Sequence, residues 1–423
     1  MDENAKNSVR IACVLLWYPL FTQPFIFREI QELKKELPCE IHTLYGKNLA
    51  HCSEEMRQKA SEVFTNGIAA LARVVATLFS HLLFHPKETV QIFRSFLGYK
   101  WPNFEIFGEN LWALSMGFLL ARRFEEDKID VVYAPWPRGT TTCARVIFHL
   151  TGIPFVTTVR GDNLCPMDPD LPDKLNDCAI IRANNLADQK RIEAIVKGKT
   201  RLVYNGLTLP SRALPQHILS YSPEKRPLAL MALGRFDVTK GFDILLQTLF
   251  LLRKKISVTL TLAGGGGVKM GLGKLEGELR RLTHELGLDD IVTYPGLISH
   301  TDLPRIFSEH DIFVAPCVID KEGRRDGIPN TVIEAMSMAL PVVTSDIHAL
   351  PEVCVHKKTG LTCPQKDPQA LCDALFWLSA HREEAAKMGE AAREHVKNLF
   401  DPQKNAQKLG RLLADAARKN GRG

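Results

Sequence analysis

Two carboxylates, Asp326 and Glu334, are the side chains best placed to do chemistry in this chain. Asp326 precedes a Gly-Ile-Pro segment that indicates a loop, and Glu334 lies eight residues later in a helix-forming run. One carboxylate from a loop and one from a helix can accept hydrogen bonds from the same polyhydroxylated ligand. The N–H groups at the start of that helix favour an anion. These features predict a nucleotide-sugar site, which we expect to be lined also by Gly327, Ile328, Pro329, Asn330 and Thr331.

Two cations, Arg235 and Lys240, lie upstream in the segment 234–241, which reads GRFDVTKG. They follow a predicted strand and precede a predicted helix. A guanidinium binds a diphosphate through two parallel hydrogen bonds, and an ammonium adds a second point charge. Negative charge develops on a departing diphosphate, so fixed cations there stabilise the transition state more than the ground state. The alternatives are surface cations near a helix start, a solvated helix acid for Glu334 and an N-terminal helix acid for Asp326.

The elements that must position these residues alternate between strand and helix. In the first half, apolar runs predict strands at 10–18, 41–44, 131–134 and 154–159, with short strands at 178–183 and 200–203. In the second half, strands are predicted at 228–232, 258–263, 291–294, 312–315 and 341–344, with helices between them. Such alternation is typical of doubly wound parallel α/β sheets, which bind ligands at the carboxyl ends of their strands.

The length of 423 residues suits two domains. A segment rich in Pro and Ser without periodicity separates the two alternating halves. We predict an N-terminal domain at 1–208 with a helical insertion at about 51–125, a linker at 209–227 and a second domain at 228–395. The remaining residues, 396–423, predict a helix that packs back on the first domain.

The ordered pair of motifs resembles the family 4 retaining glycosyltransferases of the GT-B fold, of the bacterial polysaccharide and glycan-biosynthesis type. The resemblance covers the second half well and the first half loosely. It implies two Rossmann-like domains facing a central cleft, with the donor mainly on the second domain and the acceptor mainly on the first. It further implies that Arg235 and Lys240 hold the donor diphosphate, that Glu334 binds the ribose and that Asp326 faces the sugar. Relatives commonly have Glu where Asp326 stands.

The first half departs from the family pattern in several places. Many relatives have His where Arg160 stands, although some carry Arg-Gly-x-Asp; here 160–163 read Arg-Gly-Asp-Asn. Arg160 is therefore a candidate for binding the phosphate or the acceptor, and a structural salt bridge with Asp162 is the alternative. The loop 19–25 lacks the glycines found in many relatives, and 25–30 (FIFREI) matches a subset of the family. In the second half, Gly265 belongs to a glycine run that permits close approach to the donor or forms a plain turn.

Composition limits the class of protein. Apolar content is 45% and charged content 24%, as in ordinary soluble proteins, and the net charge is +6. The chain has no long basic run or stacking-aromatic array, which argues against nucleic acid as a partner. The ten cysteines form no C-x-x-C pair, which favours free thiols in a reducing compartment. A polar start argues against a signal peptide. The aromatic and basic stretch 71–123 is either core or a membrane contact.

We therefore predict a retaining hexosyltransferase that uses a UDP- or GDP-linked sugar and a glycan or lipid-linked acceptor, in cell-surface polysaccharide or glycolipid biosynthesis. Its expected location is the cytoplasm, with peripheral contact to the cytoplasmic face of the inner membrane. Neither a cofactor nor a metal is expected, because Arg235 and Lys240 take the place of a metal at the diphosphate. The alternatives are a non-catalytic sugar-nucleotide-binding scaffold or another GT-B enzyme, such as a sugar-nucleotide epimerase or a phosphorylase.

Overall fold

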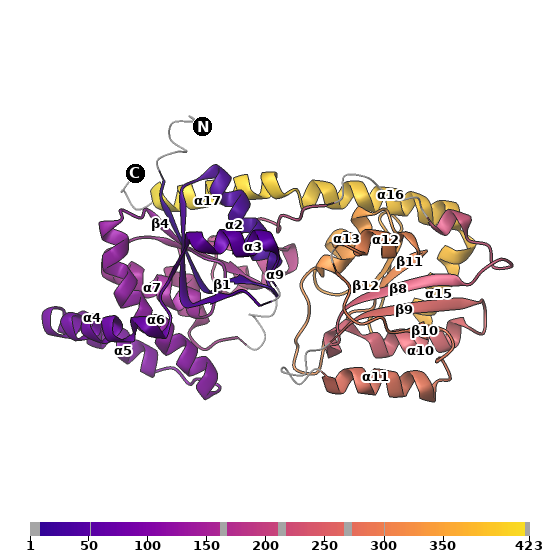
Figure 1. Ribbon diagram of the computed structural model, residues 1–423, viewed down its shortest axis with the longest axis horizontal. Helices are drawn as coiled ribbons and strands as arrows, with labels where there is room; N and C mark the ends of the chain where they lie inside the picture. The colour runs from indigo at the N-terminus through magenta and orange to yellow at the C-terminus, as the bar shows by residue number, and fades with distance from the viewer. Residues whose placement is uncertain are drawn as a thin grey trace. The chain divides into compact units, whose positions relative to one another are not determined.

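A computed structural model describes residues 9–50, 52–160, 167–209, 217–265, 273–299 and 301–418 (Figure 1). The chain divides into two units. Unit 1 comprises Met1–Leu207 together with Phe400–Gly423, and unit 2 comprises Thr208–Leu399. Each unit is a parallel sheet flanked by helices (Figure 1). The predicted fold class, two Rossmann-like α/β domains of the GT-B type, is confirmed at this level.

The sheet of unit 1 is built from apolar runs that are buried on both faces, as parallel strands require. Its spatial order is β3-β2-β1-β4-β5-β6-β7, and neighbouring strands pair in parallel. The order reverses between β1 and β4, which is where open α/β sheets place their ligands. The strands are β1 (Ile11–Leu20), β2 (Cys39–Asn48), β3 (Val63–Thr65), β4 (Val131–Ala134), β5 (Phe155–Val159), β6 (Ile180–Ala183) and β7 (Thr200–Leu202).

Helices cover both faces of this sheet. They are α2 (Pro24–Glu36), α7 (Gly139–Thr151), α8 (Leu171–Asp177), α9 (Leu186–Ile195) and α17 (Pro402–Arg418). The last of these packs along α2, where Gly410 permits a close approach to Leu37 and Leu33. The chain enters α17 beside the end of unit 1, because the Leu207 N–H donates to the Phe400 carbonyl at 2.9 Å.

The helical insertion consists of α3 (Glu54–Lys59), η1 (Ala60–Glu62), η2 (Ile68–Ala70), α4 (Leu71–Phe84), α5 (Pro86–Leu97) and α6 (Phe104–Glu126). Its aromatic stretch splits into two parts. Helix α6 is core, and Gly117 allows it to pack tightly against Val146 of α7. Helices α4 and α5 instead form a hairpin with many exposed apolar side chains.

Unit 2 repeats the strand order, as β10-β9-β8-β11-β12-β13, and neighbouring strands pair in parallel. The strands are β8 (Leu228–Arg235), β9 (Val258–Gly265), β10 (Val292–Thr293), β11 (Ile312–Ala315), β12 (Val342–Ser345) and β13 (Leu361–Cys363). The helices are η4 (His217–Ser220), η5 (Val238–Lys240), α10 (Phe242–Leu252), α11 (Gly273–Glu285), α12 (Leu303–Ser308), α13 (Asn330–Ser337), α14 (Leu350–Val353), α15 (Pro368–Ala380) and α16 (Arg382–Leu399).

Two boundaries differ from the sequence-based expectation. The segment expected to be a linker at 209–227 falls within unit 2, and its residues Ile218 and Tyr221 are buried in the core of that unit. The expected start of the last helix at 396 lies inside α16. The break comes instead at Phe400 and Asp401, because Pro402 suits the first turn of a new helix.

Candidate functional site

An ion pair between Lys240 and Asp326 forms the centre of the predicted donor site. Nζ of Lys240 lies 2.6 Å from Oδ2 of Asp326, and the two side chains are only 12% and 18% exposed. Burial alone would lower the pKa of Lys240, but the adjacent Asp326 carboxylate outweighs it, so the pKa is raised and the ammonium is held charged. Within the described residues, Oδ2 of Asp326 makes no other polar contact.

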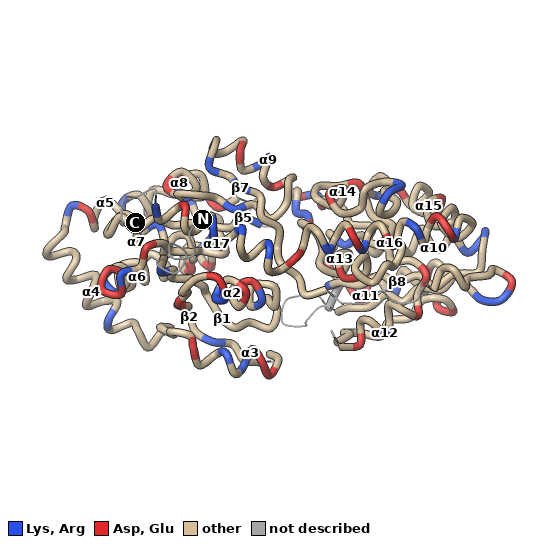
Figure 2. The backbone as a smooth tube through the Cα atoms, turned by 90° about the horizontal axis from the view of Figure 1, so that it is seen from above, with Lys and Arg blue, Asp and Glu red and all other residues tan. Residues whose placement is uncertain are grey.

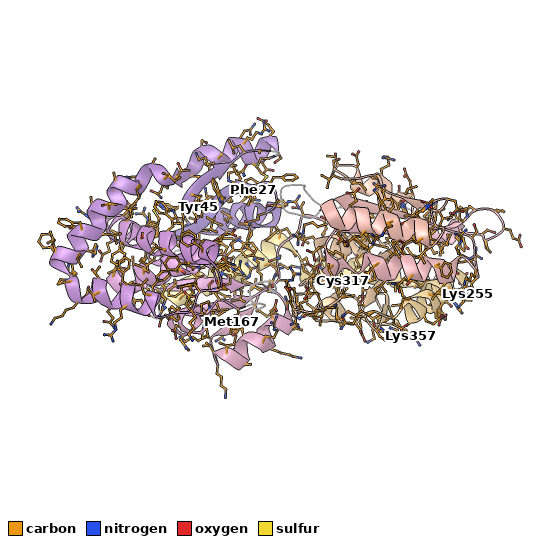
Figure 3. All side chains as sticks on the ribbon, turned by 90° about the horizontal axis from the view of Figure 1, so that it is seen from below. Phe27, Tyr45, Met167, Lys255, Cys317 and Lys357 are labelled. Carbon is orange, nitrogen blue, oxygen red and sulfur yellow. The ribbon has the colours of Figure 1, made fainter. Side chains whose placement is uncertain are left out.

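A glycine brings the two loops that carry this pair together. Gly241, directly after Lys240, has φ of +64°, and a Cβ there would lie 2.0 Å from the Pro316 carbonyl oxygen. The Val318 N–H also donates to the Thr239 carbonyl at 2.8 Å. The loop after β8 is therefore clamped to the loop after β11, which begins beside Cys317, labelled in Figure 3. Only glycine satisfies both the backbone conformation and the contact.

Arg235 ends β8 beside Gly265 of β9, because the two residues pair in register. Its side chain is exposed and has no ion pair with any residue in the described ranges. Two residues further on, burial alone would raise the pKa of Asp237. The hydrogen bonds from Thr239 and the charge of Arg235 outweigh burial and lower this pKa, so the carboxylate stays charged and caps the turn. Arg235 is thus a cation on a fixed turn that is available to an anionic ligand.

The turn at the end of β9 leaves no room for a side chain. Gly264 has φ of +132°, and a Cβ there would lie 1.8 Å from the Gly234 carbonyl oxygen. A Cβ on Gly234 would in turn lie 3.2 Å from Cε of Lys240. These glycines let the two central strands and the lysine stem pack together. Of the predicted glycine run, Gly264 and Gly265 are described, and 266–267 lie outside the described residues.

Helix α13 begins directly after the Asp326 loop. Pro329 precedes its first residue and provides no side-chain cap. The N–H groups of the following loop and helix residues donate to no acceptor within the described chain: Gly327, Ile328, Asn330 and Thr331. Such unpaired donors at a helix N-terminus attract an anion. Glu334 lies one turn further on and is half-buried. The structure therefore gathers the predicted donor residues at the carboxyl edge of β8, β9 and β11, which are neighbours in the sheet.

Arg160 occupies a different environment in unit 1. Its side chain follows β5 and is 7% exposed. Nη1 donates to Oδ1 of Asn205 at 2.7 Å, and Nη2 lies 3.6 Å from Oε1 of Glu29. The guanidinium also lies over the rings of Phe25 and Trp136, at 5.1 and 5.2 Å. The alternative partner, Asp162, lies outside the described residues.

A buried charge network surrounds Arg160, and reasoning from the sequence missed most of it. Glu29 of α2 accepts from Arg182 Nη1 at 2.5 Å and from the Tyr133 hydroxyl at 2.7 Å. Burial opposes ionisation of Glu29, but Arg182, Arg160 and Tyr133 together lower its pKa. Burial lowers the pKa of Arg160. Two guanidiniums thus share one carboxylate, and Nε and Nη2 of Arg160 make no hydrogen bond within the described chain. The sequence signal that could have revealed this network is the segment 25–30, because its Glu29 is the shared carboxylate.

Two features of the described residues bear on metals and membranes. Within the described ranges, no three His, Cys, Asp or Glu side chains are grouped so as to hold a metal ion. No single described helix has both the length and the apolar character of a membrane span; Ile68–Phe84 and Pro86–Leu97 meet these criteria only as a pair, bent by 119°.

Comparison with known proteins places this geometry in context. Residues 227–381 match the family model described as glycosyl transferases group 1. The amylovoran biosynthesis glycosyltransferase AmsK of Erwinia amylovora is 28% identical over 191 residues, 44% of this chain and 45% of AmsK. A GDP-mannose-dependent alpha-(1-6)-phosphatidylinositol monomannoside mannosyltransferase of Mycobacterium tuberculosis is 30% identical over 201 residues, 47% of this chain and 50% of the relative. The matched region thus spans about half the length of these curated relatives.

Solved structures extend the likeness of fold to the whole chain. Anabaena Alr3699/HepE in complex with UDP superposes with a TM-score of 0.72 at 15% identity, covering 96% of this chain and all of that one. Sucrose-phosphate synthase from Thermosynechococcus elongatus gives 0.71 at 16% identity, covering 97% of this chain and all of that one. At such identities the likeness concerns the fold. The family match runs from the start of β8 to the end of α15 and includes the whole predicted donor site. Within its second unit, over residues 227–381, the chain is therefore similar to the group 1 glycosyl transferases.

Proposed function

We propose that this protein is a retaining glycosyltransferase that moves a hexosyl unit from a nucleotide-diphosphate sugar to a glycan or lipid-linked acceptor. The observation that carries the proposal is the clamped pair of loops in unit 2, which sets Lys240 and Asp326 beside an unpaired Arg235 and an uncapped helix start. This is a site with cations and N–H donors for a diphosphate and carboxylates for hydroxyls. Relatives named for amylovoran and phosphatidylinositol-mannoside synthesis support a role in polysaccharide or glycolipid biosynthesis.

The chemistry proposed for this site is stabilisation of the leaving diphosphate. Arg235, which has no competing described carboxylate, binds two diphosphate oxygens, and Lys240 supplies the second charge. Glu334 accepts from the ribose hydroxyls, and Asp326 accepts from the donor sugar. Because these cations neutralise the diphosphate, we expect turnover without an added metal. The test is to measure activity after treatment with EDTA, and full activity is expected. Loss of activity that a divalent ion restores would contradict the expectation.

The identity of the nucleotide is open between UDP and GDP. Anabaena Alr3699/HepE was solved with UDP-glucose, whereas the mycobacterial relative is named as GDP-mannose-dependent. Arg160 is assigned to the acceptor side, because its buried guanidinium has two nitrogens without hydrogen bonds in the described chain and shares the single Glu29 carboxylate with Arg182. We further place the protein in the cytoplasm at the inner face of the membrane. The described cysteines, all of them free thiols, support a reducing compartment.

Donor hydrolysis and transfer by the purified protein test the proposal. Wild type incubated with UDP- and GDP-sugars is expected to release nucleotide slowly, and faster with the correct acceptor. Arg235→Gln removes charge-assisted hydrogen bonds worth about 1.5–3 kcal/mol each, so kcat/KM should fall about 10²–10⁴-fold. The kcat/KM of Glu334→Gln should fall by about tenfold or more, because this variant also loses charge-assisted hydrogen bonds.

Two surface variants are the matched controls. Arg305 and Glu309 form an exposed ion pair on and beside α12 in the same unit, so Arg305→Gln and Glu309→Gln should retain wild-type activity. If the protein binds nucleotide but neither hydrolyses the donor nor transfers sugar to any acceptor extract, the non-catalytic scaffold becomes the better interpretation. An altered donor sugar without transfer would replace the proposal by an epimerase. Unchanged activity of Arg235→Gln would remove the site assignment.

A further inference from the structure

The helical hairpin α4–α5 exposes an unusual amount of apolar surface. Among the described residues, twenty large apolar side chains are exposed, and ten of them lie between Ile68 and Phe104. These are Ile68, Leu71, Val75, Phe79, Leu82, Leu83, Phe84, Val90, Leu97 and Phe104. Single exposed apolar residues are ordinary, but a contiguous group marks a surface that contacts something apolar.

Helix α4 is predominantly apolar, with Arg73, Thr77 and Ser80 on one polar stripe, yet only Val74 of its residues is buried. Arg73 is the single Lys, Arg, Asp or Glu side chain in this helix. A helix of this kind is normally enclosed in a protein core or in lipid. The exposed side chains include Phe79 at 63% and Leu83 at 60%. The outer surface of α4 therefore lacks the apolar packing partner that is usual for a helix of this composition.

The hairpin is nevertheless anchored to unit 1. Phe93 of α5 stacks on Phe118 of α6 with ring centroids 6.0 Å apart, and Phe96 is buried in the same cluster. Between α4 and α5 lies a groove of about 870 Å³ with an almost entirely apolar lining, which includes Val75, Phe79, Leu82, Val90 and Leu97. The apolar surface is thus displayed on a packed support and is part of the folded unit.

The charge carried by this part of the chain points to its partner. The exposed charged residues between 68 and 100 are Arg73, Lys87, Glu88, Arg94 and Lys100, a net charge of +3. The remaining surface of α4 and α5 carries no Lys, Arg, Asp or Glu, and Figure 2 draws most of this stretch in tan. An exposed apolar surface with a net positive charge suits a partner that is apolar inside and anionic outside, which is the interface of a bilayer with acidic lipids.

We propose that α4 and α5 seat this protein in the headgroup region of an anionic membrane, with the outer face of α4 among the acyl chains. A second copy of the chain is a poorer partner, because two such surfaces in contact would each carry a net charge of +3 and would repel each other. This proposal names the surface that would hold the protein at the membrane. It rests on the proposed function only in the reason for membrane binding, which is access to a lipid-linked acceptor. Binding to lipid itself does not depend on catalysis.

The test is flotation of purified full-length protein with vesicles of phosphatidylcholine, alone or mixed with phosphatidylglycerol. Wild type should bind the mixed vesicles and bind much less to pure phosphatidylcholine. The double variant Phe79→Asp/Leu83→Asp should bind the mixed vesicles at least about tenfold more weakly, because both side chains would leave the apolar layer. Arg73→Gln and Arg94→Gln should each weaken binding about fivefold and reduce its sensitivity to salt.

Phe376→Asp is the matched control, since Phe376 is 40% exposed on α15 of unit 2. It should bind vesicles as wild type does. All variants should keep wild-type melting temperatures and donor hydrolysis, which separates this test from the test of the proposed function. Equal vesicle binding by the double variant, or none by wild type, overturns the proposal. A wild-type dimer that the double variant converts to monomer also overturns it, in favour of a second copy.

Discussion

Replacement of Asp326 by asparagine removes the charge from the ion pair with Lys240 and keeps the size of the side chain. At 2.6 Å and an effective dielectric constant of about 20, the direct attraction is about 6 kcal/mol. Part of this attraction is offset by desolvation of both groups, and breaking a buried pair costs about 3–5 kcal/mol. Asparagine can still accept one hydrogen bond from the ammonium, so we expect the lower end of this range.

A loss of about 3 kcal/mol should lower the melting temperature of unit 2 by about 6–12 °C. UDP or GDP should recover part of this loss, because its diphosphate provides the anion that Lys240 has lost. The thermal shift on adding nucleotide is therefore expected to be larger in Asp326→Asn than in wild type; tenfold tighter binding adds about 1.4 kcal/mol. Turnover of the nucleotide-sugar should fall, since the sugar contact is weakened.

Differential scanning fluorimetry with and without nucleotide measures both effects. Asp373→Asn is the matched control, because it breaks an ion pair of similar length, 2.8 Å to Lys255, at an exposed position. Exposed pairs contribute about 0–1 kcal/mol, so this variant should melt as wild type does. An unchanged melting temperature in Asp326→Asn, or a nucleotide shift smaller than that of wild type, would refute the reasoning.

Two further predictions concern backbone and charge. Gly241→Ala should destabilise unit 2 and abolish donor turnover, because its Cβ would collide with the Pro316 carbonyl, whereas Gly287→Ala, with φ of +63° and open space around it, should lose only about 1 kcal/mol on thermal unfolding. The pKa of Glu29 is lowered in the folded state, so its stabilisation is present at neutral pH and is lost as the pH falls below about 4.5. Glu29→Gln should therefore unfold more readily in urea at neutral pH, by about 3–5 kcal/mol, and show a flatter decline in acid; a parallel decline would contradict the charged network with Arg182.

Local patterns in the sequence determined much of unit 2. The apolar runs of β8, β9 and β11 and the turn residues after them were enough to predict a parallel sheet with Arg235, Lys240 and Asp326 at one edge. This worked because parallel topology brings the carboxyl ends of neighbouring strands together whatever the length of chain between them. Strand β13, only Leu361–Cys363, was missed, because a run this short has no recognisable period.

Tertiary structure alone decided which charges meet. The sequence predicted separate roles for Lys240 and Asp326, but the contact of Gly241 with Pro316 draws their loops together and pairs them. In the same way Glu29 lies 153 residues from Arg182 in the chain, yet both are buried in one hydrogen-bonded network. Such contacts depend on how the elements pack, and packing is set by many weak apolar contacts that no short motif encodes.

The exposed hairpin shows the same division. Composition and spacing of 71–123 indicated apolar helices but left both core packing and membrane contact open. Folding buried α6 against α7 and left the outer face of α4 uncovered, because one layer of helix is enough to close that side of the sheet. The sequence by itself thus determined the type of each element and the chemistry at the strand ends. The tertiary structure decided which ion pairs form and which apolar faces remain in need of a partner.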